Sequence, residues 1–212
     1  PRWIHATSAV SKWPLKASVE AGGEGDDVLG SNIGIASANS SFVLSGGDNS
    51  MNFAGSRQTK VTIPWSAELN TAEFSVSMWV KATASSNEYK SALTSRAANS
   101  HQGYMIHNIR GIWEFWIGSG DHYRKARTTP ESGSVLLNTW QHLAVSYGAG
   151  IMTLYVDGVP APALSIENFQ PNLDKDCGLQ IGAGSCRGTN YFFDGSVKDV
   201  SFFDVAVSRS DV

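Results

Sequence analysis

Apolar and polar side chains alternate along many short stretches of the chain, and Gly, Asn, Ser, Asp and Pro separate these stretches. The clearest case is residues 140–161, WQHLAVSYGAGIMTLYVDGVPA, where the alternation stops at the GAG of residues 148–150 and again at the Asp-Gly step 157–158. Successive side chains of a strand point to opposite faces, and glycine-containing steps favour tight hairpin turns. The pattern predicts three consecutive antiparallel strands in this stretch.

Helical periodicity is almost absent, so the chain is predicted to be all-β. The period-two alternation predicts strands in residues 50–54, 60–63, 73–82, 91–96, 104–109, 111–118, 122–129, 140–147, 151–158, 179–183 and 191–205. A meander of this many strands has to stack its sheets face to face around a shared core. The predicted fold is therefore an antiparallel β-sandwich. Residues 19–39, rich in Gly, Asp and Ser, are predicted to form a long loop.

Length and charge narrow the classes of function. A sandwich of 212 residues is commonly one unit, so we expect a single domain over residues 1–212. The net charge of −3 comes from 19 acidic and 16 basic residues, which form no long runs, and this disfavours nucleic acid as a partner. No apolar run approaches the roughly 20 residues of a membrane span, so membrane insertion is not expected. The chain begins at Pro1, and we expect it to be excised from a larger protein whose other domains are further partners.

The two cysteines, Cys177 and Cys186, lie close together in CGLQIGAGSC. They form either a local disulfide or two free thiols, and their spacing is not that of a zinc site. If residues 178–183 form one straight strand, they span about 17 Å, and the remaining residues do not bring the cysteines within the ~7 Å that bridging requires. A disulfide requires the chain to reverse near Gly182 or Gly184. It would indicate an oxidising compartment.

Several pieces of the sequence, taken in order, resemble the laminin G-like, or concanavalin A-like lectin and glucanase, jelly roll. They are NSMNFAG followed by KVTIP, EFSVSMWVKA, NTWQHLAVSYGAGIMTLYVDGVP, LQIGAG and NYFFDGSVKDVSFFDVAVS, which together cover most of residues 50–208. The resemblance implies two curved antiparallel sheets, one concave and one convex. Many members bind carbohydrate on the concave sheet or rim loops, often with calcium, whereas others are protein-adhesion modules or glucanases. A fold shared by so many activities does not decide among them.

Hydrolysis of a glycosidic bond requires two carboxylates. They lie about 5 Å apart in retaining glycosidases and farther apart in inverting ones. The glucanases of this fold carry such acids at alternating positions of one strand. Here Glu114, in GIWEFWIG, has no acidic partner at positions 112, 116 or 118, so hydrolysis is disfavoured. Lyase chemistry by Tyr104, His107 and Arg110 is the alternative, but such residues also decorate any polar sheet face.

Oxygen-rich loops predict a calcium site, because calcium binds six to eight oxygen ligands. Asp199 matches an aspartate at the start of the last long strand that, in the resembled glucanases, helps to hold a structural calcium. Asp48, Asp27 and Asn52 are the other candidate ligands. The alternative is that these residues cap their own backbone turns.

A sugar-binding face is predicted on the strand of residues 111–118. The alternation separates Trp113, Phe115 and Ile117 from the less apolar face of Glu114 and Trp116, so Trp116 is the candidate for an exposed ring. The alternative is that Trp116 covers one end of the core, as most tryptophans do. Tyr123, past the following turn, and His107 and Arg110, on the preceding strand, are predicted to share this binding surface.

Four other residues are assigned to the core because the resembled pattern is apolar at their positions: Trp79, Trp140, Leu154 and Val156. His142 is predicted to be a buried, hydrogen-bonded histidine.

The sequence therefore predicts a non-catalytic recognition module that is extracellular or at the cell surface. A glycan is the favoured ligand, with a supporting calcium ion. A protein-adhesion module that binds a cell-surface protein is the first alternative, and a polysaccharide hydrolase or lyase is the second.

Overall fold

The computed structural model describes residues 9–15, 24–25, 29–37, 41–45, 48–55, 59–97, 101–166, 169, 171–186 and 191–208. Within these residues the regular secondary structure consists of β-strands and one short 3-10 helix, η1 (Ala67–Leu69), so the predicted all-β class is confirmed. No helix among them is long and apolar enough to cross a membrane.

Sheet A has nine strands among the described residues, in the order β14-β13-β12-β7-β17-β5-β4, with β1 paired to β17 and β15 paired to β13. The strands are β1 (Ala9–Trp13), β4 (Ser41–Ser45), β5 (Asp48–Ala54), β7 (Phe74–Ala82), β12 (Gln141–Gly148), β13 (Ile151–Val156), β14 (Val159–Pro160), β15 (Leu164–Ser165) and β17 (Asp194–Phe203).

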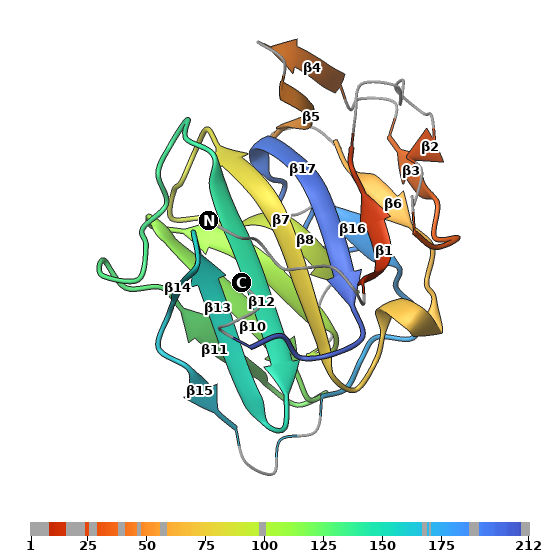
Figure 1. Ribbon diagram of the computed structural model, residues 1–212, viewed down its shortest axis with the longest axis vertical. Helices are drawn as coiled ribbons and strands as arrows, with labels where there is room; N and C mark the ends of the chain where they lie inside the picture. Colours follow the sequence, from red (N-terminus) through yellow and green to blue (C-terminus); the bar gives the residue numbers. More distant parts are fainter. Residues whose placement is uncertain are drawn as a thin grey trace.

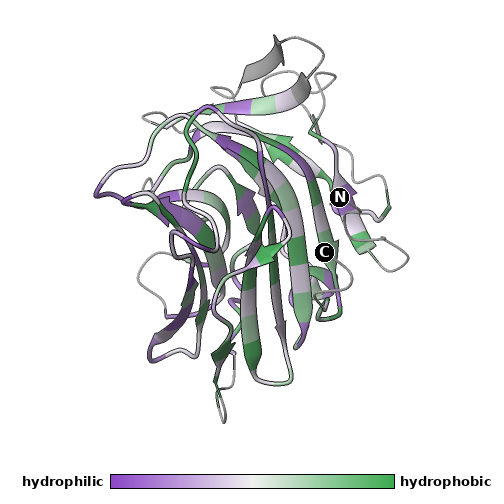
Figure 2. Ribbon diagram, turned by 60° about the vertical axis from the view of Figure 1, so that its left-hand side comes forward, coloured by the Kyte–Doolittle hydropathy of each residue, from purple (hydrophilic) through white to green (hydrophobic). Residues whose placement is uncertain are grey.

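Sheet B has eight strands in the described part of the chain, in the order β11-β10-β9-β8-β16-β6-β3-β2. They are β2 (Glu24–Gly25), β3 (Gly34–Ala36), β6 (Val61–Ile63), β8 (Lys90–Ser95), β9 (Tyr104–Ile109), β10 (Ile112–Gly118), β11 (Tyr123–Arg127) and β16 (Leu179–Ile181). The neighbours in both sheets are antiparallel. Figure 1 shows sheet A stacked in front of sheet B, and Figure 2 shows the curvature of the two layers and the alternating hydropathy along their strands. The predicted sandwich is confirmed.

The core lies between the two sheets, and Phe74 of β7 is near its centre. Its ring stacks on Phe202 of β17, with centroids 5.9 Å apart. It also contacts two rings of sheet B, Tyr104 of β9 and Phe115 of β10, with centroid distances of 4.5 and 6.2 Å. Phe74 is fully buried, so it joins the two layers through direct aromatic contacts.

The hairpin predicted from the alternation is present as β12 and β13, paired from Leu143–Val156 to Gly148–Ile151. Its turn places Ala149 and Gly150 at φ of 48° and 72°. Positive φ at both central residues suits the right-handed twist of a hairpin. The second turn, which leads into the short β14, uses the Asp-Gly step in the same way, with φ of 52° at Asp157 and 80° at Gly158.

Residues 19–39 differ from the predicted long loop. They contain β2 and β3, which pair with each other and join the edge of sheet B through β6. These strands are two and three residues long, which is too short for an alternation pattern to reveal.

Two of the four predicted core residues lie elsewhere. Leu154 and Val156 are in the core, as predicted. Trp79 is half-buried on the outer face of sheet A, because Met78 and Val80 on either side of it occupy the inner face. Trp140 is also half-buried, just before β12, and the ammonium groups of Lys81 and Lys198 lie 5.0 and 4.4 Å from its ring centroid.

His142 is 3% exposed, and its backbone N–H donates to the Asp157 carboxylate. Burial lowers the pKa of its imidazole to about 4, so the ring is neutral at pH 7.

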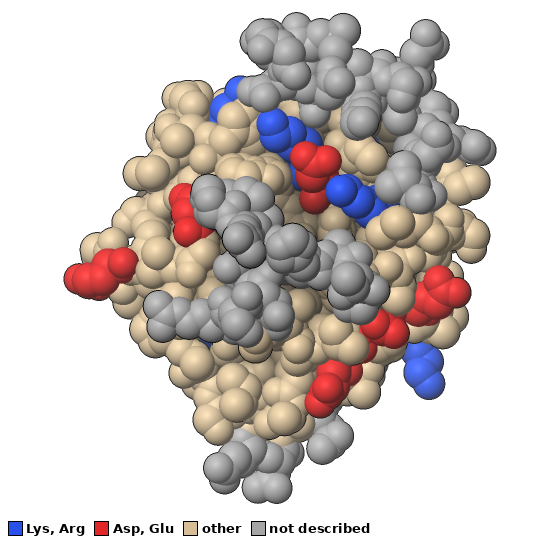
Figure 3. Space-filling model, viewed as in Figure 1, with Lys and Arg blue, Asp and Glu red and all other residues tan. Residues whose placement is uncertain are grey.

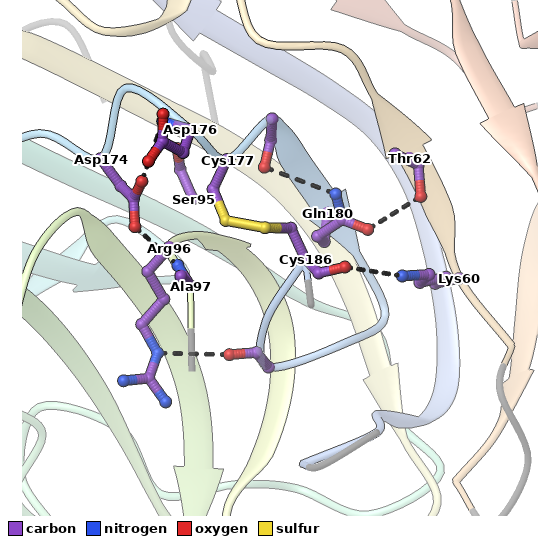
Figure 4. The surroundings of a disulfide bond; sticks show 12 residues. Lys60, Thr62, Ser95, Arg96, Ala97, Asp174, Asp176, Cys177, Gln180 and Cys186 are labelled. Atoms are coloured by element: carbon purple, nitrogen blue, oxygen red, sulfur yellow. Dashed lines mark hydrogen bonds between the residues drawn. A yellow bond between two sulfur atoms is a disulfide. The ribbon is translucent and has the colours of Figure 1, made fainter. Parts of the chain in front are cut away.

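The structure joins Cys177 to Cys186 in a disulfide, with the two Cα atoms 5.7 Å apart (Figure 4). The strand between them, β16, is only three residues long, and Gly182 follows it at φ 84°. A Cβ at this position would collide with the ring of Phe53, so the reversal depends on glycine.

Candidate functional site

The outer face of sheet B, which points away from sheet A, carries a polar patch centred on β10. Trp113, Phe115 and Ile117 point into the core, so the intervening Glu114 and Trp116 point outward. The strand register then fixes their neighbours. Glu114 lies between His107 of β9 and Arg127 of β11, and Trp116 lies between Met105 and Lys125.

Glu114 is the centre of a buried hydrogen-bond network. Its Oε2 accepts from the indole Nε1 of Trp116 at 2.7 Å and lies 3.2 Å from Nε2 of His107. Its Oε1 pairs with Nε of Arg127 at 2.8 Å. Glu114 is only 3% exposed, and each oxygen of its carboxylate has a donor. This satisfies the requirement that a buried charge be paired.

The charges in this network follow from burial and hydrogen bonding. Burial raises the pKa of Glu114, but the hydrogen bonds from His107 and Trp116 outweigh it and hold the pKa below its usual value. Burial lowers the pKa of His107 by more than the contact with Glu114 raises it. Glu114 is therefore ionised and His107 neutral at pH 7. A neutral imidazole facing a carboxylate donates from Nε2, which leaves Nδ1 without a proton. This buried Nδ1 has no hydrogen-bond partner among the described residues.

An aromatic row crosses the same face, formed by Tyr191, Tyr89, Trp116, Tyr123 and His101. Successive ring centroids lie 5.4, 5.3, 5.2 and 5.3 Å apart, and the rings meet in tilted or edge-on geometry. Such contacts are favourable arrangements of aromatic quadrupoles, so the rings hold one another in place. Trp116 and Tyr123 come from β10 and β11, whereas the other three rings come from connecting segments.

The aromatic row borders a pocket of about 550 Å³. This volume lies within the range of small-ligand sites. The pocket is lined by Tyr89, Arg96, His101, Met105, His107, Trp116, His122, Tyr123, Lys125 and Tyr191.

Arg96 forms part of the pocket wall and is held by neutral oxygens. Its Nε donates to the carbonyl of Gly184 at 3.2 Å, and one terminal nitrogen donates to the Tyr123 hydroxyl at 2.7 Å. Gly184 belongs to the disulfide loop, which Figure 4 shows beside the Arg96 side chain. Cys186 in turn donates its N–H to the carbonyl of Arg96. The disulfide loop therefore positions both Arg96 and, through it, Tyr123.

Three of the four predicted ligand-binding residues come together in this pocket: His107, Trp116 and Tyr123. Arg110 does not line it. It lies in the turn between β9 and β10 at φ 51°, is exposed, and donates its N–H to the carbonyl of Ser86 at 2.8 Å.

The prediction that Trp116 is an exposed ring is wrong. The side chain points to the predicted face but is 9% exposed, because Tyr89, His107 and Tyr123 surround it. The Lys125 ammonium also lies 3.6 Å from the centroid of its ring. The exposed rings of the row are instead those at its two ends, Tyr191, which is 38% exposed, and His101.

Sequence reasoning missed several lining residues for two different reasons. Lys125 lies directly opposite Trp116 across the β10–β11 pairing, so the register of that hairpin would have found it. Tyr89, Arg96 and Tyr191 lie far from β10 in the sequence and reach the site only through tertiary folding. No local pattern identifies residues of that kind.

Two of the four predicted calcium ligands, Asn52 and Asp199, have side chains among the described residues. Asn52 donates its side-chain amide to the Ser196 hydroxyl and the Gly195 carbonyl. Asp199 lies in β17 at φ 52° and donates its N–H to the Pro14 carbonyl. Asp27 and the side chain of Asp48 lie outside the described residues. Within the part of the chain described, no three His, Cys, Asp or Glu side chains are close enough to hold a metal ion.

On the opposite face of the molecule, the described Lys and Arg side chains do not form a continuous basic surface. On the face of sheet A shown in Figure 3, the Lys and Arg side chains of described residues are few and are interspersed with Asp and Glu.

Several solved structures are similar to this chain. Domain 4 of AbnA, a GH43 extracellular arabinanase from Geobacillus stearothermophilus, was solved with arabinotriose; it is 15% identical with a TM-score of 0.72, and the match covers 96% of both chains. The botulinum neurotoxin serotype D binding domain is 18% identical with a TM-score of 0.73, over 96% of this chain and 50% of that one. The binding domain of botulinum neurotoxin DC in complex with SialylT is 12% identical with a TM-score of 0.72, over 97% of this chain and 50% of that one. This chain thus spans about half the length of the botulinum binding domains.

Sequence comparison shows the family. No curated protein matches the chain in sequence. Residues 54–212 match the family model described as the concanavalin A-like lectin/glucanases superfamily. This match covers more than half of the chain and agrees with the double-layered fold. The chain therefore belongs to the concanavalin A-like lectin/glucanases superfamily.

Proposed function

We propose that this domain is a non-catalytic carbohydrate-binding module of an extracellular or cell-surface protein, and that the sugar binds in the pocket on the outer face of sheet B. The observation that carries the proposal is the aromatic row along a pocket of about 550 Å³. Ring faces pack against the C–H faces of a sugar, and each such contact contributes on the order of 1 kcal/mol beyond burial. The phenol, imidazole and ammonium groups of the lining supply hydrogen bonds to hydroxyls.

The Glu114 network supports the pocket from beneath. Glu114 does not line the pocket, and its oxygens already take hydrogen bonds from Trp116, His107 and Arg127. Its role in the proposal is to fix the orientation of the Trp116 and His107 rings. A site whose side chains are held before the ligand arrives loses less entropy on binding.

The non-catalytic assignment is supported by the composition of the lining. Glycosidases require two carboxylates beside the scissile bond. Among the described residues that line this pocket, none carries a carboxylate.

Two further observations support the class of ligand and the compartment. The arabinanase domain that this chain matches over nearly its full length was solved with arabinotriose. The disulfide supports an oxidising environment, because such bonds persist mainly outside the cytosol.

Binding to a glycan array is the direct test, with the hits titrated against Tyr89→Ala. Tyr89 contacts the rings of His107, Trp116 and Tyr191, so its loss should weaken binding by about 3- to 10-fold. The matched control is Trp65→Ala, which removes a ring that is 42% exposed and does not line the pocket. It should leave the affinity unchanged. Absence of binding to every glycan, or equal binding by the Tyr89→Ala variant, would refute the proposal.

The proposal also includes a structural calcium ion near Asp199. Its basis is the oxygen-rich loops of the sequence. An ion that binds only the folded chain raises the melting temperature by mass action. We expect millimolar calcium to raise the melting temperature relative to chelated protein, and Asp199→Asn to reduce that shift. Identical melting curves with calcium and with chelator would remove calcium from the account. The array repeated with chelator separates this structural role from a role in sugar binding.

A further inference from the structure

Arg96 is a buried cation that no carboxylate of the described residues neutralises. The side chain is 8% exposed, and its two hydrogen-bond acceptors, the Gly184 carbonyl and the Tyr123 hydroxyl, are both uncharged. The two ion pairs among the described residues both belong to Glu114, and neither includes Arg96. Buried charges in folded proteins are normally paired, because an unpaired one loses its hydration without compensation.

Two buried acidic groups beside the pocket are already engaged. Glu114 pairs with Arg127 and takes hydrogen bonds from the pocket rings beneath the surface. Asp174, whose charge acts on Tyr123, accepts the backbone N–H groups of Ala97 and Asp176 (Figure 4). Neither carboxylate forms an ion pair with the guanidinium of Arg96.

The pocket itself has a positive lining. Arg96 and Lys125 both line it, and its remaining described residues are aromatic rings, histidines and a methionine. Lys125 is partly buried over the Trp116 ring, and Arg96 lies 5.6 Å from the centroid of Tyr123. A sugar that packs along the aromatic row therefore brings its substituents within reach of both cations.

We propose that the ligand of this pocket is an acidic sugar, whose carboxylate or sulfate is bound by Arg96 and Lys125. This inference rests on the proposed sugar-binding function and adds the chemical class of the sugar. An arginine binds a planar or tetrahedral oxyanion through charge-assisted hydrogen bonds, which are stronger and shorter than neutral ones. The anion would supply the negatively charged partner that Arg96 lacks among the described side chains.

Isothermal titration calorimetry with matched oligosaccharides tests the proposal. Oligogalacturonides are compared with their fully methyl-esterified forms, and heparin oligosaccharides with their desulfated forms, so each pair differs mainly in charge. We expect at least one of the two, the free galacturonide or the sulfated heparin oligosaccharide, to bind about tenfold or more tightly than its less charged counterpart. This preference should shrink as NaCl is raised, because salt screens partly exposed charges. The carboxylate and sulfate arms identify which anion is bound.

Variants locate the effect. Arg96→Gln and Lys125→Gln should each reduce the preference for the acidic form, whereas Arg124→Gln is the matched control. Arg124 is exposed on the same strand and does not line the pocket. Because Arg96 is buried, its replacement could disturb folding. Lys125→Gln and the salt dependence test the proposal without the Arg96 variant.

The outcomes separate the two proposals. If the more charged and the less charged form of each pair bind equally, and Tyr89→Ala weakens both, the acidic-sugar inference is overturned while the sugar-binding function stands. If the acidic form binds more tightly but Lys125→Gln leaves the preference unchanged, the inference is also overturned, because the anion is then bound elsewhere. If no glycan of the array or of these pairs binds, both proposals fail together.

Discussion

Replacing Phe74 with alanine is expected to lower the free energy of unfolding by about 3–5 kcal/mol, the usual cost of emptying a buried phenylalanine site. The ring is fully buried and contacts Phe202 in its own sheet and Tyr104 and Phe115 in the other. A cavity at this position removes aromatic contacts between the layers as well as apolar burial. For a chain of this length the melting temperature should fall by about 2–4 °C for each kcal/mol.

Urea denaturation and calorimetry measure this effect. Trp65→Ala removes a large exposed ring and is expected to change stability by less than about 0.5 kcal/mol. A loss of under about 1 kcal/mol for Phe74→Ala would mean that the two sheets do not pack through this ring, and the sandwich described above would be in error.

The second large effect is expected at Glu114. Glu114→Ala leaves the buried donors of Trp116 and His107 without their acceptor, whereas Arg127 is 54% exposed and can turn to water. Each buried donor left unsatisfied costs about 1–3 kcal/mol, so the variant should lose about 2–6 kcal/mol of stability. Because Trp116 and His107 also lose their fixed orientation, glycan binding should weaken even at temperatures where the variant is folded.

The pH dependence of stability isolates the carboxylate. The pKa of Glu114 is lower in the folded chain than in the unfolded one, so the unfolded state binds more protons in the intervening range. The stabilisation is fully present above the unfolded pKa of about 4.3 and is lost as pH falls through the lower folded value. Burial also lowers the pKa values of His107 and His142. These histidines therefore add a loss of stability that begins as the pH falls below about 6.5.

Glu114→Gln is the matched variant for this measurement, because it keeps the shape of the side chain and removes its titration. Stability of both proteins is measured by urea denaturation from pH 7 to pH 3. The wild-type curve should fall more steeply than the variant curve below about pH 4.3. Parallel curves over that range would show that the carboxylate is not stabilised in the folded state.

The sheet architecture could be predicted from the sequence because alternation is a local signal. The β12–β13 hairpin and the inward face of β10 follow directly from side chains at every second position. The same rule explains the error at Trp79, because Met78 and Val80 beside it point inward and an alternating strand places Trp79 outward. The assignment of Trp79 to the core rested on the family resemblance, whereas the alternation of the strand predicts the outer face.

The pocket could be predicted only in part. Trp116, Tyr123 and His107 lie on neighbouring strands, and the order of the strands along the chain already suggested that they meet. The burial of Trp116 could not be foreseen, because it depends on Tyr89 and Lys125 packing around the ring. The contribution of Arg96 depends on the disulfide loop, whose reversal at Gly182 the sequence permits but does not require.

The central claim is that a sugar binds on the outer face of sheet B, against the aromatic row. A crystal structure of the full chain with a glycan selected on the array tests it most directly. The account predicts sugar density in the pocket, in contact with Tyr89 or Tyr191 and within hydrogen-bonding distance of Lys125 or Arg96. Sugar density at a sheet edge or on sheet A, with this pocket filled only by water, would contradict the account.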